Sequence, residues 1–391
     1  MSFRSTSEMI DKEDEGKHIT EKDVVNAARD ADTIDALKQL LEDAPEEMNL
    51  AAACDEETGV TALMSAAAMG NSDAVELLLE KGGVWNAQDR RGRTAGEHAI
   101  DAEQYAVAER ILDHAVRCEL ILGAAARRTR EAERNEESVR EREEAYLRGS
   151  VKYVDDDADG GDVRLVDENN DGVMMAWEAP IMEAHAEAMM ANAATGGDDN
   201  GDDKKDELAV LNVGYGLGLI DQAIRRRKPR VHAIIEAHPE VLKRMHKDGF
   251  VDGERGVRIG SGKWQDVLST GTGGLLLNDD DKFDCIFFDT YGEYYHDMAE
   301  FHALLPSLLK TGGIYSFFNG LAPDNIFFQA VYARIIELEL KRLGIKAEFV
   351  RLEIQRPEGD TWLGVRQRYY YNDYYYMPLC RRLDVQEVEE A

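Results

Sequence analysis

The residues best suited to chemistry in this sequence form a glycine-rich turn between two short apolar runs. Gly214, Gly216 and Gly218 follow the first run. Glu236 ends the second run. Glycines let the backbone turn sharply and approach a ligand, the helix that follows directs free N–H groups at it, and an acid can accept hydrogen bonds from ribose hydroxyls. This arrangement predicts a site for a cofactor that contains adenosine.

The spacing of the glycines distinguishes between cofactors. The dinucleotide fingerprint is GxGxxG, in which the third glycine lets helix and strand pack closely beside a pyrophosphate. Here the third glycine comes one residue earlier, and the acid lies 22 residues after the first glycine. A GxGxG turn of this kind is commoner in S-adenosylmethionine methyltransferases, whose cofactor has no pyrophosphate. The alternative is a glycine-rich turn without a ligand.

An alternation of strands and helices must position this turn. After Glu236 the sequence continues with VRIGSGKW, FDCIFFDTY, a helix predicted over 296–310, and GGIYSFFNG. Two runs rich in β-branched and aromatic residues, AEFVRLEIQ and RQRYYYNDYYYMPL, predict an antiparallel pair that closes the sheet. We interpret the tyrosines at 369–371 and 374–376 as half-buried strand residues rather than a recognition platform. The predicted fold class is α/β, with a Rossmann-like sheet.

The N-terminal part repeats with a period of 33 residues. Gly59–Leu63 (GVTAL) recurs as Gly92–Gly96 (GRTAG), and this period is that of ankyrin repeats, which are built from pairs of short helices. We expect all-α, ankyrin-like repeats over 20–115, after a disordered N-terminus at 1–19. Because each unit buries its apolar face only against a neighbour, so few units serve either as a surface for a protein partner or as a stabilising cap.

Two polar segments mark the remaining boundaries. A stretch rich in Arg, Glu and Ala indicates a charged linker helix over 116–149. The domain with the glycine turn then spans 150–391. It contains the low-complexity segment TGGDDNGDDKKDE, which predicts a disordered insertion at 195–207.

Composition narrows the possible functions. The 391 residues include 78 acidic and 46 basic side chains, for a net charge of −32. Such a field repels phosphate backbones and attracts cationic partners, so we expect no nucleic-acid substrate. We find no apolar run long enough to span a bilayer and no apolar segment among the first residues, so we expect no membrane association and a cytoplasmic and nuclear location. The four cysteines form no CxxC pair, which argues against disulfides and zinc.

One segment matches the spacing of a calcium-binding EF-hand loop. Its residues are Asp167, Asn169, Asp171, Gly172 and Glu178. An EF-hand also needs a helix on each side, whereas the preceding DVRLV alternates like a strand and Asn-Asp-Gly favours a hairpin turn. We therefore prefer a tight turn that delivers VMMAWEAPIM to the active site, and we expect no metal.

Six ordered motifs carry a family resemblance: VMMAWEAPIM, LNVGYGLGL, IIEAHPEV, GKWQDV, FDCIFFDTY and GGIYSFFNG. From about Tyr153 onward the sequence resembles guanidinoacetate N-methyltransferase. With the ankyrin-like repeats in front, nearly the whole chain resembles the fungal protein arginine N5-methyltransferases (type IV), which modify the internal δ-nitrogen of arginine. The resemblance implies a class I methyltransferase domain that uses S-adenosyl-L-methionine, and a basic substrate protein, with ribosomal proteins expected.

The resemblance also assigns cofactor contacts. The glycine turn would surround the amino-acid end of the cofactor, Glu236 would bind its ribose, a Trp-Gln pair would flank the adenine, and two methionines and a tyrosine would lie near the sulfonium. The full set is Tyr153, Met174, Met182, Gly214, Tyr215, Gly216, Leu217, Gly218, Leu219, Glu236, Ala237, His238, Trp264, Gln265 and Asp289. The sequence departs from the family at Asn212, where an acid is frequent.

Guanidinium chemistry indicates the catalytic residues. An arginine guanidinium stays protonated at physiological pH and has no free lone pair, so a methyltransferase must orient it and remove a proton. Carboxylates match its fork of N–H groups. We therefore expect Glu178 and Asp289 to hold the guanidinium, with Asp289 as the base. Tyr291 and Asn319 are expected as further substrate contacts. The structural alternatives are a surface acid at 178 and a turn cap at 289.

Three functions fit these residues. The first is methylation of the arginine δ-nitrogen in a basic protein. The second is methylation of a small guanidino compound such as guanidinoacetate, against which the ankyrin-like repeats argue. The third is an inactive binding scaffold, to which only Asn212 points. The sequence leaves the oligomeric state open and favours a monomer.

Overall fold

The structure, a computed structural model, describes residues 20–29, 34–43, 52–133, 147–154, 163–194, 207–270, 282–291, 295–384 and 387. The chain divides into two compact units between Cys118 and Glu119. The predicted disordered N-terminus at 1–19 lies outside the described residues, as do 195–206 of the insertion predicted at 195–207 and 134–146 of the predicted linker. In the part of the chain that is described, no helix combines the length and apolar character needed to cross a membrane.

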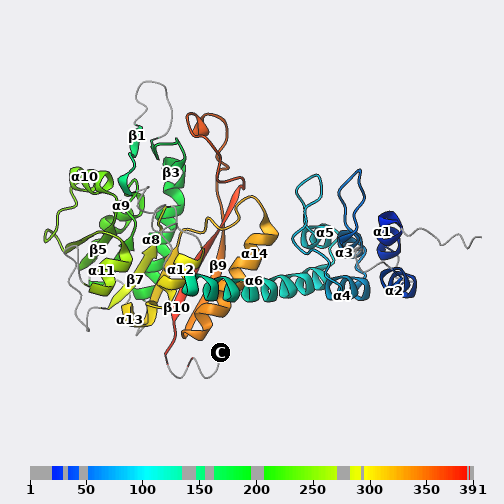
Figure 1. The fold of residues 1–391 in the computed structure, drawn as a ribbon. Helices are drawn as coiled ribbons and strands as arrows, with labels where there is room; N and C mark the ends of the chain where they lie inside the picture. Colours follow the sequence, from blue (N-terminus) through cyan, green and yellow to red (C-terminus); the bar gives the residue numbers. More distant parts are fainter. Residues whose placement is uncertain are drawn as a thin grey trace, which may run out of the picture. The chain divides into compact units, whose positions relative to one another are not determined.

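Short helices build the N-terminal unit (Figure 1). They are α1 (Glu21–Arg29), α2 (Ile34–Glu42), α3 (Ala62–Ala68), α4 (Ser72–Glu80), α5 (Ala95–Asp101) and the beginning of α6 (Tyr105–Glu133). The 33-residue period reappears in the helix caps. The hydroxyls of Thr61 and Thr94 each accept a hydrogen bond from the third N–H of the helix that follows, at 3.1 and 3.4 Å. The repeated Gly-x-Thr therefore marks the start of equivalent helices, as the period predicts.

A seven-stranded sheet forms the second unit. Its strands lie in the order β6 (Val257–Ser261), β5 (Val231–Glu236), β4 (Ala209–Val213), β7 (Phe283–Phe288), β8 (Leu309–Phe317), β10 (Tyr374–Arg382) and β9 (Ile345–Glu353). The first five are parallel, and β10 runs antiparallel to both of its neighbours. The predicted Rossmann-like sheet with an antiparallel edge is confirmed.

Helices cover both faces of this sheet because alternate strand residues are apolar on each side. One face packs Val210 and Ile234 against residues of α8 (Ala179–Ala194), α9 (Leu219–Arg226) and α10 (Pro239–Lys247). The other packs Leu211 and Ile235 against α11 (Trp264–Thr270), α12 (Tyr295–His302), α13 (Leu305–Leu308) and α14 (Ile326–Arg342). The strands are thereby fixed, and their carboxyl ends form a rigid edge.

A small antiparallel sheet precedes α8. Its strands are β1 (Lys152–Val154), β2 (Arg164–Val166) and β3 (Gly172–Met175), and the 3-10 helix η3 (Ala176–Glu178) connects β3 to α8. β2 and β3 form a hairpin around Asn170, whose φ is 61°. The hairpin that we preferred to an EF-hand is confirmed, since a strand rather than a helix precedes the loop.

Two element predictions are wrong. The helix expected over 296–310 is divided into α12 and α13, because Pro306 cannot continue a helix and sits in the first turn of α13. The tyrosine-rich run is also divided. Tyr374–Tyr376 belong to β10, whereas Tyr369–Tyr371 precede this strand, in the segment that follows the 3-10 helix η6 (Gly359–Trp362).

Candidate active site

The glycine turn lies where the strand order of the sheet reverses. β4 ends at Val213 and pairs with β5 on one side and β7 on the other, and open parallel sheets bind ligands at the carboxyl ends of strands at such a point. Gly214 has a φ of +97°, and a Cβ atom there would lie 1.8 Å from the carbonyl oxygen of Asp289. Only glycine fits this position, and it brings the turn directly against the backbone of Asp289.

We expect Gly214→Ala to destabilise the protein by about 2–5 kcal/mol, the sum of left-handed strain and forced displacement of the Asp289 carbonyl. Gly312→Ala is the matched control, because Gly312 has a φ of +78° but no atom within 4 Å of its added Cβ. It should show only the strain, about 1–2 kcal/mol. Urea unfolding measures the stability of both variants, and titration with S-adenosylhomocysteine measures their affinity for this cofactor product. Equal losses in the two would contradict the close approach of turn and acid.

Glu236 is held in place by backbone N–H groups of the turn and of the next helix. Its Oε2 accepts a hydrogen bond from the Tyr215 N–H at 2.8 Å, and its Oε1 accepts one from the His238 N–H at 2.7 Å. Burial raises the pKa of this carboxyl, and the N–H donors act in the opposite direction. The carboxylate lines the cavity beside the turn, so its remaining lone pairs are available to ligand hydroxyls.

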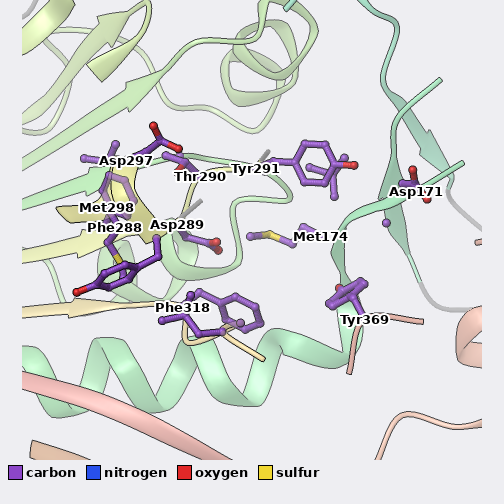
Figure 2. Close-up of a pocket in the computed structure, with 18 of the residues that line it drawn as sticks. Asp171, Met174, Phe288, Asp289, Thr290, Tyr291, Asp297, Met298, Phe318 and Tyr369 are labelled. Carbon is purple, nitrogen blue, oxygen red and sulfur yellow. The ribbon is translucent and has the colours of Figure 1, made fainter. Parts of the chain in front are cut away.

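One cavity of about 1550 Å³ lies at this edge of the sheet. Figure 2 shows Asp289, Met174, Phe318 and Tyr369 around it. The residues predicted for cofactor or substrate that line it are Met174, Glu178, Gly214, Gly216, Glu236, Ala237, Trp264, Gln265, Asp289 and Tyr291. The structure therefore brings together residues from β3, η3, β5 and α11 and from the segments that follow β4 and β7.

The other predicted residues are absent from the lining of that cavity, which is drawn from the described residues. They are Tyr153, Met182, Tyr215, Leu217, Gly218, Leu219, His238 and Asn319. Several support the turn from outside. The Tyr153 hydroxyl donates to the Gly216 carbonyl at 2.9 Å, and the Tyr215 hydroxyl donates to Asp248 at 3.0 Å. Asn319 is buried, and its amide donates to the Tyr376 carbonyl at 3.0 Å rather than facing the cavity.

The two acids predicted to hold the guanidinium, Glu178 and Asp289, both line the cavity; Glu178 is buried, and Asp289 is half-buried. Burial and the charge of Asp289 raise the pKa of Glu178 to about 8. Burial raises the pKa of Asp289 to about 7. The Oδ2 atom of Asp289 is buried without a hydrogen-bond partner among the described residues. A buried carboxylate is costly without a partner, so this pair is suited to a cation that binds in the cavity.

Tyr369 is a cavity residue that the sequence did not reveal. Its hydroxyl donates a hydrogen bond to Oε1 of Glu178, to which the Met175 N–H also donates at 2.9 Å. The two residues are 191 positions apart, and no spacing rule connects them. Phe318 also lines the cavity and stacks on Tyr375, with ring centroids 5.7 Å apart. Phe318 directly follows the last residue of β8. In the sequence, this position at the end of a strand was the only indication that it lines the site.

The loop with EF-hand spacing uses its acids for other contacts. Asp167 accepts hydrogen bonds from the N–H groups of Asn169 and Asp171, at 2.9 and 2.8 Å. Asp171 pairs with the Arg366 guanidinium, whose Nε donates at 2.8 Å. Glu178, the last residue of the pattern, is bound to Tyr369. Among the described residues no group of three or more His, Cys, Asp or Glu is arranged to hold a metal ion.

The residues beside the turn fit S-adenosylmethionine. Gly216 lets Met174 pack directly on the turn, since a Cβ atom on Gly216 would lie 2.8 Å from the Met174 sulfur. Glu236 would hold the ribose hydroxyls, Trp264 and Gln265 would lie beside the adenine, and the unpartnered oxygen of Asp289 would face the cationic end. When bound, this cofactor supplies a methyl group from a positively charged sulfur.

Asn212, where the sequence departs from the family pattern, lies directly beside an acid, Asp221. Its Nδ2 donates to Asp221 Oδ2 and to the Gly214 carbonyl, both at 2.8 Å. Asp221 is buried on α9 and also contacts His232 Nε2 at 2.9 Å. The carboxyl group missing at 212 is therefore present at the start of the next helix, bonded to the asparagine.

Family comparisons separate the same two parts of the chain. A model described as Guanidinoacetate N-methyltransferase matches residues 150–380. A model described as Ankyrin repeats (3 copies) matches residues 24–121. The repeat prediction is thereby confirmed, and the domain with the carboxylate pair is a methyltransferase domain.

Curated relatives named Protein arginine N-methyltransferase 2 match much of the chain. The one from Yarrowia lipolytica is 36% identical over 262 residues, 64% of this chain and 51% of the relative. Those from Aspergillus fumigatus and Saccharomyces cerevisiae are 30% and 31% identical over 350 and 336 residues, covering 80% and 78% of this chain and 78% and 76% of the relatives. The chain thus spans about half the length of the first relative and about three quarters of the other two. It belongs to the family of Protein arginine N-methyltransferase 2.

Proposed function

We propose that this protein transfers a methyl group from S-adenosyl-L-methionine to the internal δ-nitrogen (N5) of an arginine in a basic protein, with ribosomal proteins as the expected substrates. The observation that carries the proposal is a pair of carboxylates in one cavity beside the glycine turn: Glu178, which is buried, and Asp289, whose Oδ2 is buried. The names of the relatives support arginine methylation.

The carboxylate pair suits the internal nitrogen of a guanidinium. Each carboxylate can bind N–H groups of the planar fork through its two oxygens. If Glu178 and Asp289 hold the terminal amino groups, the internal nitrogen is left to face the methyl donor. Positioning of this kind supplies much of the rate enhancement when reacting atoms are brought into contact in a dry site.

The same two carboxylates can accept the proton that methylation releases and balance the positive charges of the guanidinium and the sulfonium. Asp289 accepts the proton that the guanidinium releases as its nitrogen forms the new bond, and Glu178 stays ionised and holds the product. Two carboxylates balance the charges of a guanidinium and a sulfonium before transfer. After transfer, one carboxylate balances the methylated guanidinium, while the other carries the proton. The net charge in the cavity is constant throughout, which limits the electrostatic cost in a buried site.

The charges of the cavity favour a protein arginine over guanidinoacetate. Acidic residues in its lining outnumber basic ones by ten to three. A guanidinoacetate carboxylate would need a free cation, but Arg366 is paired with Asp171, Arg368 donates to the Pro357 carbonyl at 2.9 Å, and Lys263 also has an interaction partner. An arginine within a basic segment brings no such anion. Its neighbouring positive charges suit an acidic lining.

Product analysis tests the proposal. The purified protein is incubated with methyl-labelled cofactor and fungal extract, and labelled protein is hydrolysed in acid to amino acids. We expect δ-methylarginine from a basic protein, and no comparable label from guanidinoacetate. Recovery of terminal ω-methylarginine alone would contradict the N5 assignment. Equilibrium dialysis provides the control, because a chain that takes up no cofactor would be a scaffold rather than an enzyme.

We extend the proposal to the ankyrin repeats, which would offer a surface to the substrate or to another protein partner. The period of 33 residues and the match to ankyrin repeats support this role. We further propose a cytoplasmic and nuclear protein, where ribosomal proteins are made and assembled.

A further inference from the structure

Glu178 has an asymmetric environment. Both hydrogen bonds to its side chain end on Oε1, one from the Tyr369 hydroxyl and one from the Met175 N–H at 2.9 Å. Oε2 has no hydrogen-bond partner among the described residues, although the residue is only 2% exposed and lines the cavity. One oxygen is therefore fixed by the protein, and the other is left for a ligand.

Tyr369 is itself held firmly. Its ring centroid lies 5.9 Å from that of Trp177 and 5.1 Å from that of Trp362, which it meets edge-on at 89°. A Cβ atom on Gly172 would come 2.8 Å from the ring, so the glycine at the start of β3 leaves room for it. Two separate segments of the chain, 172–177 and the one that contains Trp362, thus fix the direction in which the hydroxyl points.

From these contacts we propose that Tyr369 is a positioning residue for methyl transfer: its hydroxyl anchors Oε1 of Glu178 and turns Oε2 toward the guanidinium of the substrate. This inference rests on the proposed guanidinium site. It assigns a role to a segment outside the motifs of the sequence, and it explains why a tyrosine rather than a phenylalanine stands in this aromatic cluster.

The hydroxyl also favours the ionised form of Glu178. Burial and the negative charge of Asp289 raise the pKa of Glu178, whereas the bonds from Tyr369 and the Met175 N–H lower it. Removing the hydroxyl therefore raises the pKa of Glu178 further, and the ionised carboxylate that binds a guanidinium forms only at higher pH.

Tyr369→Phe tests the proposal, because phenylalanine keeps the ring packing and removes only the hydroxyl. Tyr370→Phe is the matched control: the Tyr370 hydroxyl donates to the Tyr374 carbonyl at 2.7 Å, and Tyr370 is absent from the cavity lining. We expect the acid limb of the kcat/KM profile to move upward by about 1–2 pH units in Tyr369→Phe, with a loss of about 10- to 100-fold at pH 7. Activity should recover toward that of the wild type above the new limb.

A second readout does not depend on turnover. Methylguanidine is titrated calorimetrically into protein saturated with S-adenosylhomocysteine, in buffers of different ionisation enthalpy, and the protons released are counted at each pH. Their maximum should move upward in Tyr369→Phe and stay in place in Tyr370→Phe. A profile that keeps its position and loses only height, or an equal shift in both variants, would overturn the proposal. Product analysis of the wild type judges the N5 assignment separately, because terminal methylation would leave this shift intact.

Discussion

Asp289→Asn should remove most of the turnover while leaving the protein folded. Asparagine has nearly the same shape but cannot accept the proton, and a positioned base contributes about 10²- to 10⁴-fold to rate. Asp289 is suited to this task because burial raises its pKa to about 7 and because its Oδ2 is buried without a partner among the described residues. We expect kcat to fall by a factor in that range, measured with saturating cofactor and a substrate protein identified by labelling.

Asp324→Asn is the control for this change, because Asp324 lines the same cavity but is exposed. Loss of the Asp324 charge should alter kcat/KM by less than about fivefold, the effect expected of an exposed charge. If Asp289→Asn retained near-normal turnover, Asp289 would not be the base. If both variants lost activity equally, the general acidity of the cavity rather than one carboxylate would be responsible.

Stability provides a further check on Asp289→Asn. Burial raises the pKa of Asp289 from its ordinary value of 3.8 to about 7, so the folded state binds this proton more tightly than the unfolded state does. The free energy of unfolding therefore falls as pH rises from about 4 to 7. Asparagine does not titrate, so the substitution removes this pH-dependent contribution to the free energy of unfolding. The variant should be more stable than the wild type at pH 8, and the gain should shrink toward pH 4.

Glu178→Gln should weaken guanidinium recognition by about 3–5 kcal/mol, or about 10²- to 10⁴-fold in kcat/KM, as for a broken buried charge pair. It should also change the pH dependence. The proposed mechanism requires two ionised carboxylates in the wild type, with pKa values raised to about 7 and about 8, so log kcat/KM should rise with a slope near two on the acid side. With glutamine at 178 only one ionisation remains, and the slope should be near one.

Glu168→Gln is the matched change outside the pair, because Glu168 is an exposed acid of the same cavity lining. It should keep the slope of the wild type. An unchanged slope in Glu178→Gln would show that Glu178 does not ionise in the productive complex, and the clamp of two carboxylates would then be wrong for this residue.

Local patterns were enough to predict the edge of the sheet at which the site forms. An apolar run that ends in a glycine turn or in an acid fixes which residue stands at the carboxyl end of its strand. Val213 and Phe288 are register partners in neighbouring strands, so the residues after them, Gly214 and Asp289, meet as a consequence of that pairing. Glu236 follows from the same rule on β5.

Contacts between distant segments could not be predicted in this way. Tyr369 reaches Glu178 across 191 residues, and its tyrosine run gave no sign that the first three members would leave the strand. Asn319 follows β8 as expected, but β10 pairs with β8. The Asn319 amide donates its hydrogen bond to a backbone carbonyl of β10. Both outcomes depend on the antiparallel edge of the sheet, whose side-chain directions a single sequence does not specify.

The close approach of Gly214 to the Asp289 carbonyl couples two tasks mechanically. The turn that we propose as the seat for the methyl donor and the residue that we propose as the base meet backbone to backbone, without a side chain between them that could absorb an adjustment. A shift in either segment is passed on to the other. If both assignments hold, a substitution that changes donor affinity at this turn should also change the orientation of the proposed base.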